Sequence, residues 1–204
     1  MKKPEEFYKR VYWCSVLMVI GGGLYLLANS WGRVMGSYNI QFNFEKKIPF
    51  IPWTIFIYYL IFPYLATAIF TVPKYRDFFR VVGGYWLITF VSSAIFFMLP
   101  TTMPRPDEIV PQSGLMGLLF RAIYFVDGPH NLFPSLHVSS VSYIGFVNWR
   151  FSLRFRILST VAAILISVST LTVKQHAVVD ILGGFIVGLV TFLVMFRLLD
   201  RKYE

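Results

Sequence analysis

HAVVDILGGFIVGLVTFLVMFRL, residues 176–198, is the stretch of sequence that decides the fold. Between Asp180 and Arg197 it contains no charged side chain. About 20 mostly apolar residues are enough for a helix to cross the hydrocarbon core of a bilayer. The stretch therefore predicts a transmembrane helix over 177–198, and His176 and Asp180 lie at its start.

Five further apolar runs precede this helix, at 11–29, 53–72, 81–99, 135–149 and 156–173. The composition agrees with them, because 56% of the residues are hydrophobic and only 14% are charged. Soluble domains carry about 25% charged residues. We therefore predict an all-α polytopic membrane protein of six transmembrane helices, which form a single domain over residues 1–204.

The basic residues predict the orientation of these helices. Thirteen of the 19 lysines and arginines fall on the side that holds both termini, and six fall on the other side. An excess of basic residues marks the cytoplasmic side, so we expect both termini to be inside. The net charge of +9 does not indicate nucleic acid as a partner, because the basic residues are scattered between apolar runs.

Three loops are then expected on the non-cytoplasmic face, at 30–52, 100–134 and 174–176. The first mixes aromatic and basic residues, so it either lies at the headgroup level or forms a lid over a substrate. The second is about 35 residues long, and loops of more than about 15 residues are usually functional or disordered. We expect this second loop to be functional.

His176 and Asp180 are four residues apart, so on a helix they share a face. A carboxylate one turn away can accept the N–H of one ring nitrogen and leave the other nitrogen free as a base or nucleophile. The alternative is a hydrogen bond that only stabilises the helix. Lys174 makes this alternative less suitable, because three chargeable groups within seven residues favour an anion site.

Two more segments of the same face suit a phosphate. Ser135 follows Pro134 at the start of the 135–149 run, where it can cap the helix, and the free N–H groups of a helix N-terminus bind phosphate. His137 lies beside them. Arg105 is suited to bidentate phosphate binding, or else to a lipid headgroup. A site with these residues favours phosphoryl transfer through a histidine.

No metal or other cofactor is expected. A dinuclear metal site needs more carboxylates than this face offers. The sequence also contains no glycine-rich phosphate loop followed by a lysine, which argues against nucleotide hydrolysis.

The site residues resemble the motifs of the type 2 phosphatidic acid phosphatase superfamily, the six-helix membrane lipid phosphatases related to vanadium haloperoxidases. The second motif, Pro-Ser-Gly-His, matches at 134–137 with Leu136 in place of glycine. The third, Ser-Arg-x5-His-x3-Asp, matches at 169–180 with Thr170 in place of arginine. Of the first, Lys-x6-Arg-Pro, only Arg105 and Pro106 match, and Met98 stands at the lysine position. The resemblance covers roughly residues 50–195.

The resemblance implies that His176 attacks phosphorus, that Asp180 orients it, and that His137 protonates the leaving oxygen. It also implies a set of groups that hold the phosphoryl oxygens. These are Arg105, Ser135, Leu136 at the glycine position, and Lys174 in place of a missing motif cation.

The form of the motifs looks closest to the branch that includes inositol phosphorylceramide synthases. We expect a lipid phosphate or diphosphate phosphatase that acts through a phosphohistidine. The alternative is a headgroup phosphotransferase, and a lipid-binding or transporter-like protein without catalysis is also left open. The expected partners are the lipid substrate and membrane lipids, and a homodimer is left open. The small size favours a bacterial plasma membrane, with the active site facing outside.

Overall fold

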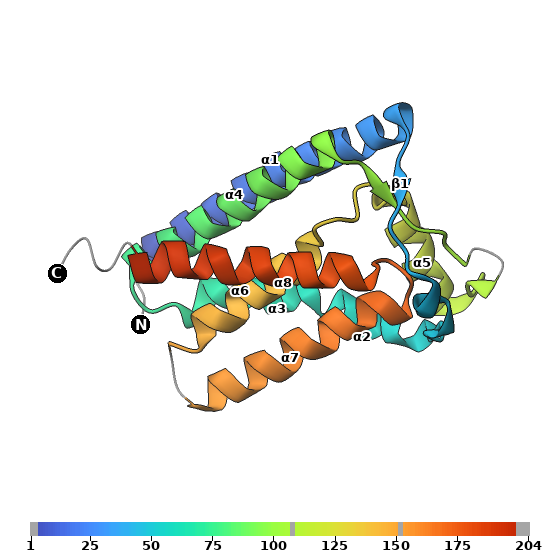
Figure 1. The fold of residues 1–204 in the computed structure, drawn as a ribbon. Helices are drawn as coiled ribbons and strands as arrows, with labels where there is room; N and C mark the ends of the chain where they lie inside the picture. Colours follow the sequence, from blue (N-terminus) through green and yellow to red (C-terminus); the bar gives the residue numbers. More distant parts are fainter. Residues whose placement is uncertain (1–3, 107–108, 151–152, 199–204) are drawn as a thin grey trace.

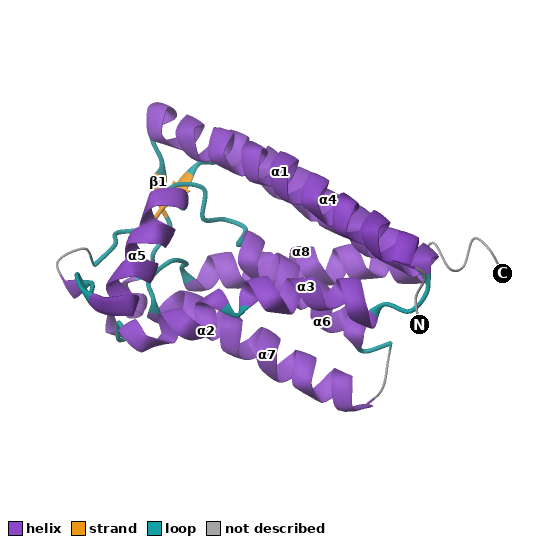
Figure 2. Ribbon diagram, turned by 180° about the vertical axis from the view of Figure 1, so that it is seen from behind, coloured by secondary structure: helices purple, strands orange, loops and turns teal. Residues whose placement is uncertain are grey.

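The structure is a computed structural model that describes residues 4–106, 109–150 and 153–198 (Figure 1). Its helices are α1 (Pro4–Met35), α2 (Ile55–Tyr59), α3 (Ile61–Thr71), α4 (Tyr75–Met98), α5 (Gly114–Val126), α6 (Leu136–Asn148), α7 (Leu153–Thr172) and α8 (Val178–Leu193). A π-helical turn, Val194–Leu198, continues α8, and short 3₁₀ turns lie at Asn43–Lys47 and Pro52–Thr54. The strands β1 (Tyr38–Asn39) and β2 (Thr101–Thr102) pair in parallel, and Figure 2 shows how small they are beside the helices. The fold is all-α, as expected.

Among the described residues, four helices are long and apolar enough to cross a membrane. They are α1, α4, α7 and α8 with its continuation to Arg197. Such helices indicate an integral membrane protein. The runs at 53–72 and 135–149 are also helical, but α6 has only 13 residues and the 53–72 run is interrupted. Six crossings and the N-in, C-in orientation stay predictions.

A proline explains the interruption between α2 and α3. The helix breaks at Leu60, and Pro63 lies three residues further on. A proline has no N–H, and its ring clashes with the carbonyl of the residue four positions earlier, which here is Tyr59 at the end of α2.

α5 departs from the expectation of a loop over 100–134. One face of this helix packs Phe120 and Ile123 against Ile55 of α2, whereas Leu118 and Phe125 on the other face are exposed. A helix of 13 residues is about 20 Å long, which is too short to cross a bilayer. α5 therefore covers the ends of the longer helices instead of spanning beside them.

α6 and α8 pack with their backbones almost in contact. A Cβ atom added to Gly184 would lie 2.7 Å from the carbonyl oxygen of Ser135, and one added to Gly188 would lie 2.6 Å from that of Ser139. Only glycine fits such an approach, as expected for two glycines four residues apart on a membrane helix. The contact holds the starts of α6 and α8 beside each other. Figure 1 places α5 and the strands at one end of the bundle and the first residues of α1 with the end of α8 at the other.

Candidate active site

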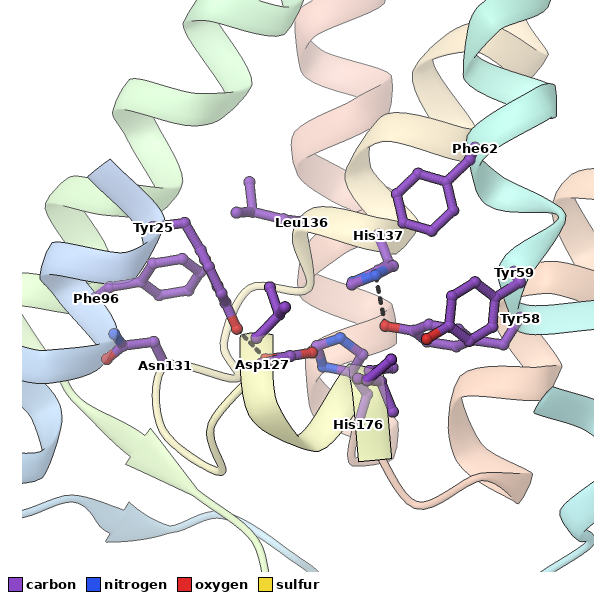
Figure 3. Close-up of a pocket in the computed structure, with 13 residues that line it drawn as sticks. Tyr25, Tyr58, Tyr59, Phe62, Phe96, Asp127, Asn131, Leu136, His137 and His176 are labelled. Carbon is purple, nitrogen blue, oxygen red and sulfur yellow. Dashed lines mark hydrogen bonds between the residues drawn. The ribbon is translucent and has the colours of Figure 1, made fainter. Parts of the chain in front are cut away.

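A cavity of about 390 Å³ lies where α1, α2, α5 and α6 meet the residues just before α8 (Figure 3). The polar side chains of its lining include Tyr58, Asp127, Asn131, His137 and His176. The rest of the lining is aromatic or aliphatic and includes Leu136. The cavity is therefore a mostly apolar chamber with a few polar groups, which is typical of a site for a small or amphipathic ligand.

His176 and Asp180 form the expected pair. His176 Nδ1 lies 3.4 Å from Asp180 Oδ2, and the same oxygen accepts a hydrogen bond of 2.8 Å from the Ala177 N–H. Asp180 is fully buried and His176 is nearly so. Among the described residues, His176 Nε2 has no hydrogen-bond partner. We assign the ring proton to Nδ1, beside the carboxylate, which leaves the Nε2 lone pair available to a ligand.

The chain brings His137 to the same cavity through the start of α6. Ser135 caps this helix, since its Oγ accepts a hydrogen bond of 3.2 Å from the Val138 N–H. The Ser135 N–H in turn donates to the Asp180 carbonyl oxygen over 3.1 Å, which ties α6 to the first turn of α8. The His137 and His176 ring centroids are 5.6 Å apart. Two imidazoles thus share one chamber.

The two cations expected at the site lie behind the cavity lining. Lys174 has a left-handed backbone, with φ of 57°, and its Nζ donates to the Ile48 carbonyl oxygen over 2.6 Å. Burial of the ammonium group lowers the pKa of Lys174, against the opposing effect of the Glu45 carboxylate. Arg105 donates to the Asp127 carbonyl oxygen over 2.6 Å and to Gln175 Oε1 over 2.9 Å.

Two residues that the sequence reasoning did not place in the site stand against the histidines. The Tyr58 hydroxyl lies 2.6 Å from His137 Nε2. The Asp127 carboxylate accepts a hydrogen bond from the Tyr25 hydroxyl, and Figure 3 shows Asp127 between Tyr25 and His176. Burial raises the pKa of Asp127, while the Arg105 guanidinium and the Tyr25 hydroxyl act in the opposite direction. From the sequence, a substrate role for Asp127 in the 100–134 loop was one of two open interpretations, and nothing in the sequence singled out Tyr58.

The loop at 42–48, here called the Glu45 loop, supports the start of α8. Glu45 is buried, its Oε2 accepts a hydrogen bond of 3.0 Å from the Val178 N–H, and its Oε1 accepts one of 3.2 Å from the Phe42 N–H. A carboxylate at a helix N-terminus is also favoured by the helix dipole. This part of the 30–52 loop therefore braces the segment that carries His176.

Comparison with known proteins adds one finding. A family model described as the PAP2 superfamily matches residues 79–204, which include Arg105, Ser135, His137, His176 and Asp180. Searches of curated proteins and of solved structures gave no significant match. The match leaves α1, α2 and α3 outside, but it covers more than half of the chain. The chain therefore belongs to the PAP2 superfamily, whose members are phosphatases and phosphotransferases.

Proposed function

We propose that the protein is a metal-independent lipid phosphate or diphosphate phosphatase that forms a phosphohistidine at His176. The observation that carries the proposal is the buried Nε2 of His176, which has no hydrogen-bond partner among the described residues and lies in the chamber that His176 shares with His137. A nucleophile needs such a free lone pair, and a second imidazole within reach can act as its acid–base partner.

In the first step, His176 Nε2 attacks phosphorus and forms the P–N bond. The bond from phosphorus to the lipid oxygen breaks, and that oxygen takes a proton from His137. The Nδ1 proton of His176 stays beside Asp180, whose negative charge stabilises the cationic phosphorylated ring. In the second step, His137 removes a proton from water, the water oxygen attacks phosphorus, and the P–N bond breaks to release phosphate.

Tyr58 suits both protonation states of His137. Because the Tyr58 hydroxyl occupies His137 Nε2, the proton that His137 exchanges with the lipid oxygen and with water is the one on Nδ1, and Nε2–H donates to the Tyr58 oxygen in both protonation states. The tyrosine can therefore hold the ring in one orientation through the whole cycle.

Arg105 is the cation that we propose for the phosphoryl group, because it contacts Asp127 of the cavity lining. Its two described hydrogen bonds go to a carbonyl and an amide oxygen, both neutral, so a phosphate dianion offers it a stronger, charge-assisted partner. Within the part of the chain that the structure describes, the hydrogen bonds of Lys174 go to the carbonyl oxygens of Glu45 and Ile48. Ser135, Leu136 and the first amides of α6 complete the proposed phosphate site.

The lipid nature of the substrate is supported by the apolar lining of the cavity and by its place among long apolar helices. The distribution of basic residues supports a site on the non-cytoplasmic face, and the membrane that we propose for it is a bacterial plasma membrane.

A headgroup phosphotransferase is the second candidate, and Asp127 is the observation that favours it. A buried carboxylate beside His176 can accept a hydrogen bond from the hydroxyl of an acceptor alcohol as readily as from water. In that reaction the alcohol replaces water in the second step, and His137 removes its proton.

One experiment separates these functions. Purified protein in lipid nanodiscs is given a panel of lipid phosphates and diphosphates, with and without added alcohols, and phosphate release and lipid products are measured. Phosphate release without an alcohol supports the phosphatase, and turnover only with an alcohol supports the transferase. His176→Asn should abolish either activity, whereas His130→Asn should not, because His130 contacts Ser37 outside the cavity. Equal turnover of wild type and His176→Asn would reject both.

A further inference from the structure

A second cavity of about 420 Å³ adjoins the catalytic chamber. It runs between α1, α3, α4 and α6 and is here called the α1 groove. Four residues line both cavities, namely Tyr25, Phe62, Leu136 and His137. The α1 groove therefore begins at the proposed acid–base histidine.

The α1 groove has the dimensions of a lipid chain. On α1 its lining extends from Tyr25 to Cys14, which corresponds to about 16 Å of helix. The hydrocarbon core of a bilayer is about 30 Å thick, so the groove is as long as one leaflet is deep. Met18, which also lines it, is 69% exposed, so the groove is open along α1 to the surrounding lipid.

Much of this wall comes from α1 and α3. α1 and α3 precede residue 79, where the family match begins. At Gly22 the groove has free space, since a Cβ atom added there would meet no other atom within 4 Å. A side chain at this position would fill the groove without disturbing the packing of the helix.

We infer that the α1 groove binds one hydrocarbon chain of the lipid substrate, with the phosphate at His176 and the chain extended along α1 toward Cys14. The inference rests on the proposed function. It is carried by the shared lining with the catalytic chamber, by the length of the groove and by its apolar walls. A chain placed there would hold the scissile phosphate between the two histidines, so the groove would select substrates by chain length.

The first test fills the groove and compares substrates. Gly22→Trp should lower kcat/KM for a long-chain lipid phosphate by about tenfold or more, because several buried methylene groups lose their contacts. It should leave the hydrolysis of a six-carbon alkyl phosphate nearly unchanged. Gly23→Trp is the matched control, since Gly23 also has free space but does not line the groove. Equal effects on both substrates, or equal effects of both variants, would overturn the inference.

A second test does not depend on turnover. Cys14 is the only cysteine of the chain and lies at the far end of the α1 groove, so its reaction with N-ethylmaleimide reports on occupancy. In nanodiscs, a long-chain alkyl phosphonate should slow the labelling of both wild type and His176→Asn, and a six-carbon phosphonate should not.

Unchanged labelling would overturn the inference, and so would equal protection by a long-chain alcohol that lacks the phosphonate, because the groove would then hold any membrane lipid. If wild type shows no turnover but the phosphonate protects Cys14 by chain length, the proposed reaction fails while the binding site stands.

Discussion

Replacing Asp180 separates the charge of this carboxylate from its hydrogen bonds. Its Oδ2 accepts the Ala177 N–H over 2.8 Å and faces His176 Nδ1 at 3.4 Å. In Asp180→Asn, the amide oxygen should take the Oδ2 position, because only an oxygen can accept the Ala177 N–H. That oxygen still accepts Nδ1–H, so the variant keeps the tautomer of His176 and loses only the negative charge.

The expected loss follows from the strength of the two kinds of bond. A hydrogen bond to a charged group contributes about 1.5–3 kcal/mol, and one between neutral groups about 0.5–1.5 kcal/mol. The charge matters most when the phosphorylated ring becomes cationic, so Asp180→Asn should lower kcat by about 5–20-fold. Asp180→Ala removes the acceptor as well and frees the ring to exchange tautomers, so it should lower kcat by about 100-fold or more.

The assay is the initial rate of product formation at saturating lipid phosphate, with thermal unfolding in detergent as the control for folding. Asp180→Asn should fall between wild type and Asp180→Ala. Equal rates for Asp180→Asn and Asp180→Ala would refute the claim that Asp180 Oδ2 keeps the ring proton of His176 on Nδ1. A wild-type rate for Asp180→Asn would show that the charge has no part in the reaction.

Three further substitutions test the surroundings of the site. Gly184→Ala should cost about 1–3 kcal/mol of stability and reduce turnover, since its Cβ would lie 2.7 Å from the Ser135 carbonyl oxygen; Gly23→Ala, in open space, should do neither. Asp127→Asn should raise the melting temperature at pH 7. Burial raises the pKa of Asp127 above its ordinary 3.8, so the stability of the wild type falls as the pH rises from 3.8 through the raised pKa of the folded protein. The asparagine variant avoids this loss. The gain should vanish below about pH 3, where the carboxyl group is protonated in both the folded and the unfolded protein, and a gain of equal size at pH 7 and at this low pH would contradict this reasoning. Glu45→Gln leaves one acceptor oxygen for two backbone N–H groups, so it should lower the melting temperature and kcat together; an unchanged kcat would show that the Glu45 loop does not position His176.

The apolar runs could be predicted from the sequence, and so could a close helix contact at Gly184 and Gly188, although not the identity of the partner helix α6. Long apolar segments have few alternatives to helices in a membrane, because every backbone polar group must be satisfied within the segment. The glycine pair on α8 predicted a close helix contact, and the structure places Gly184 and Gly188 against α6. The motif spacing also placed His176 and Asp180 on one face of a turn.

α5 could not be predicted in the same way, because its length lies below the limit for a membrane span and its sequence lies within a segment rich in prolines and polar residues. The direction of Lys174 depends on a left-handed backbone, which is uncommon for a residue other than glycine. Its nearness to His176 in sequence therefore did not indicate that its side chain turns toward the Glu45 loop.

The polar contacts of the histidines depend on tertiary packing. Tyr58 and His137 are 79 residues apart, and Tyr25 and Asp127 are 102 residues apart. No periodicity or local motif links such pairs. They meet because α1, α2 and α5 close around the start of α6.

The most direct test of the central claim is rapid-quench trapping of the intermediate. The enzyme is mixed with a lipid phosphate that carries a radiolabelled phosphoryl group, quenched in base, digested and sequenced by mass spectrometry. We predict a label that is stable in base, labile in acid, located on His176 and absent from His176→Asn. Turnover without a labelled His176 at any quench time, or a label on another residue, would contradict the phosphohistidine mechanism.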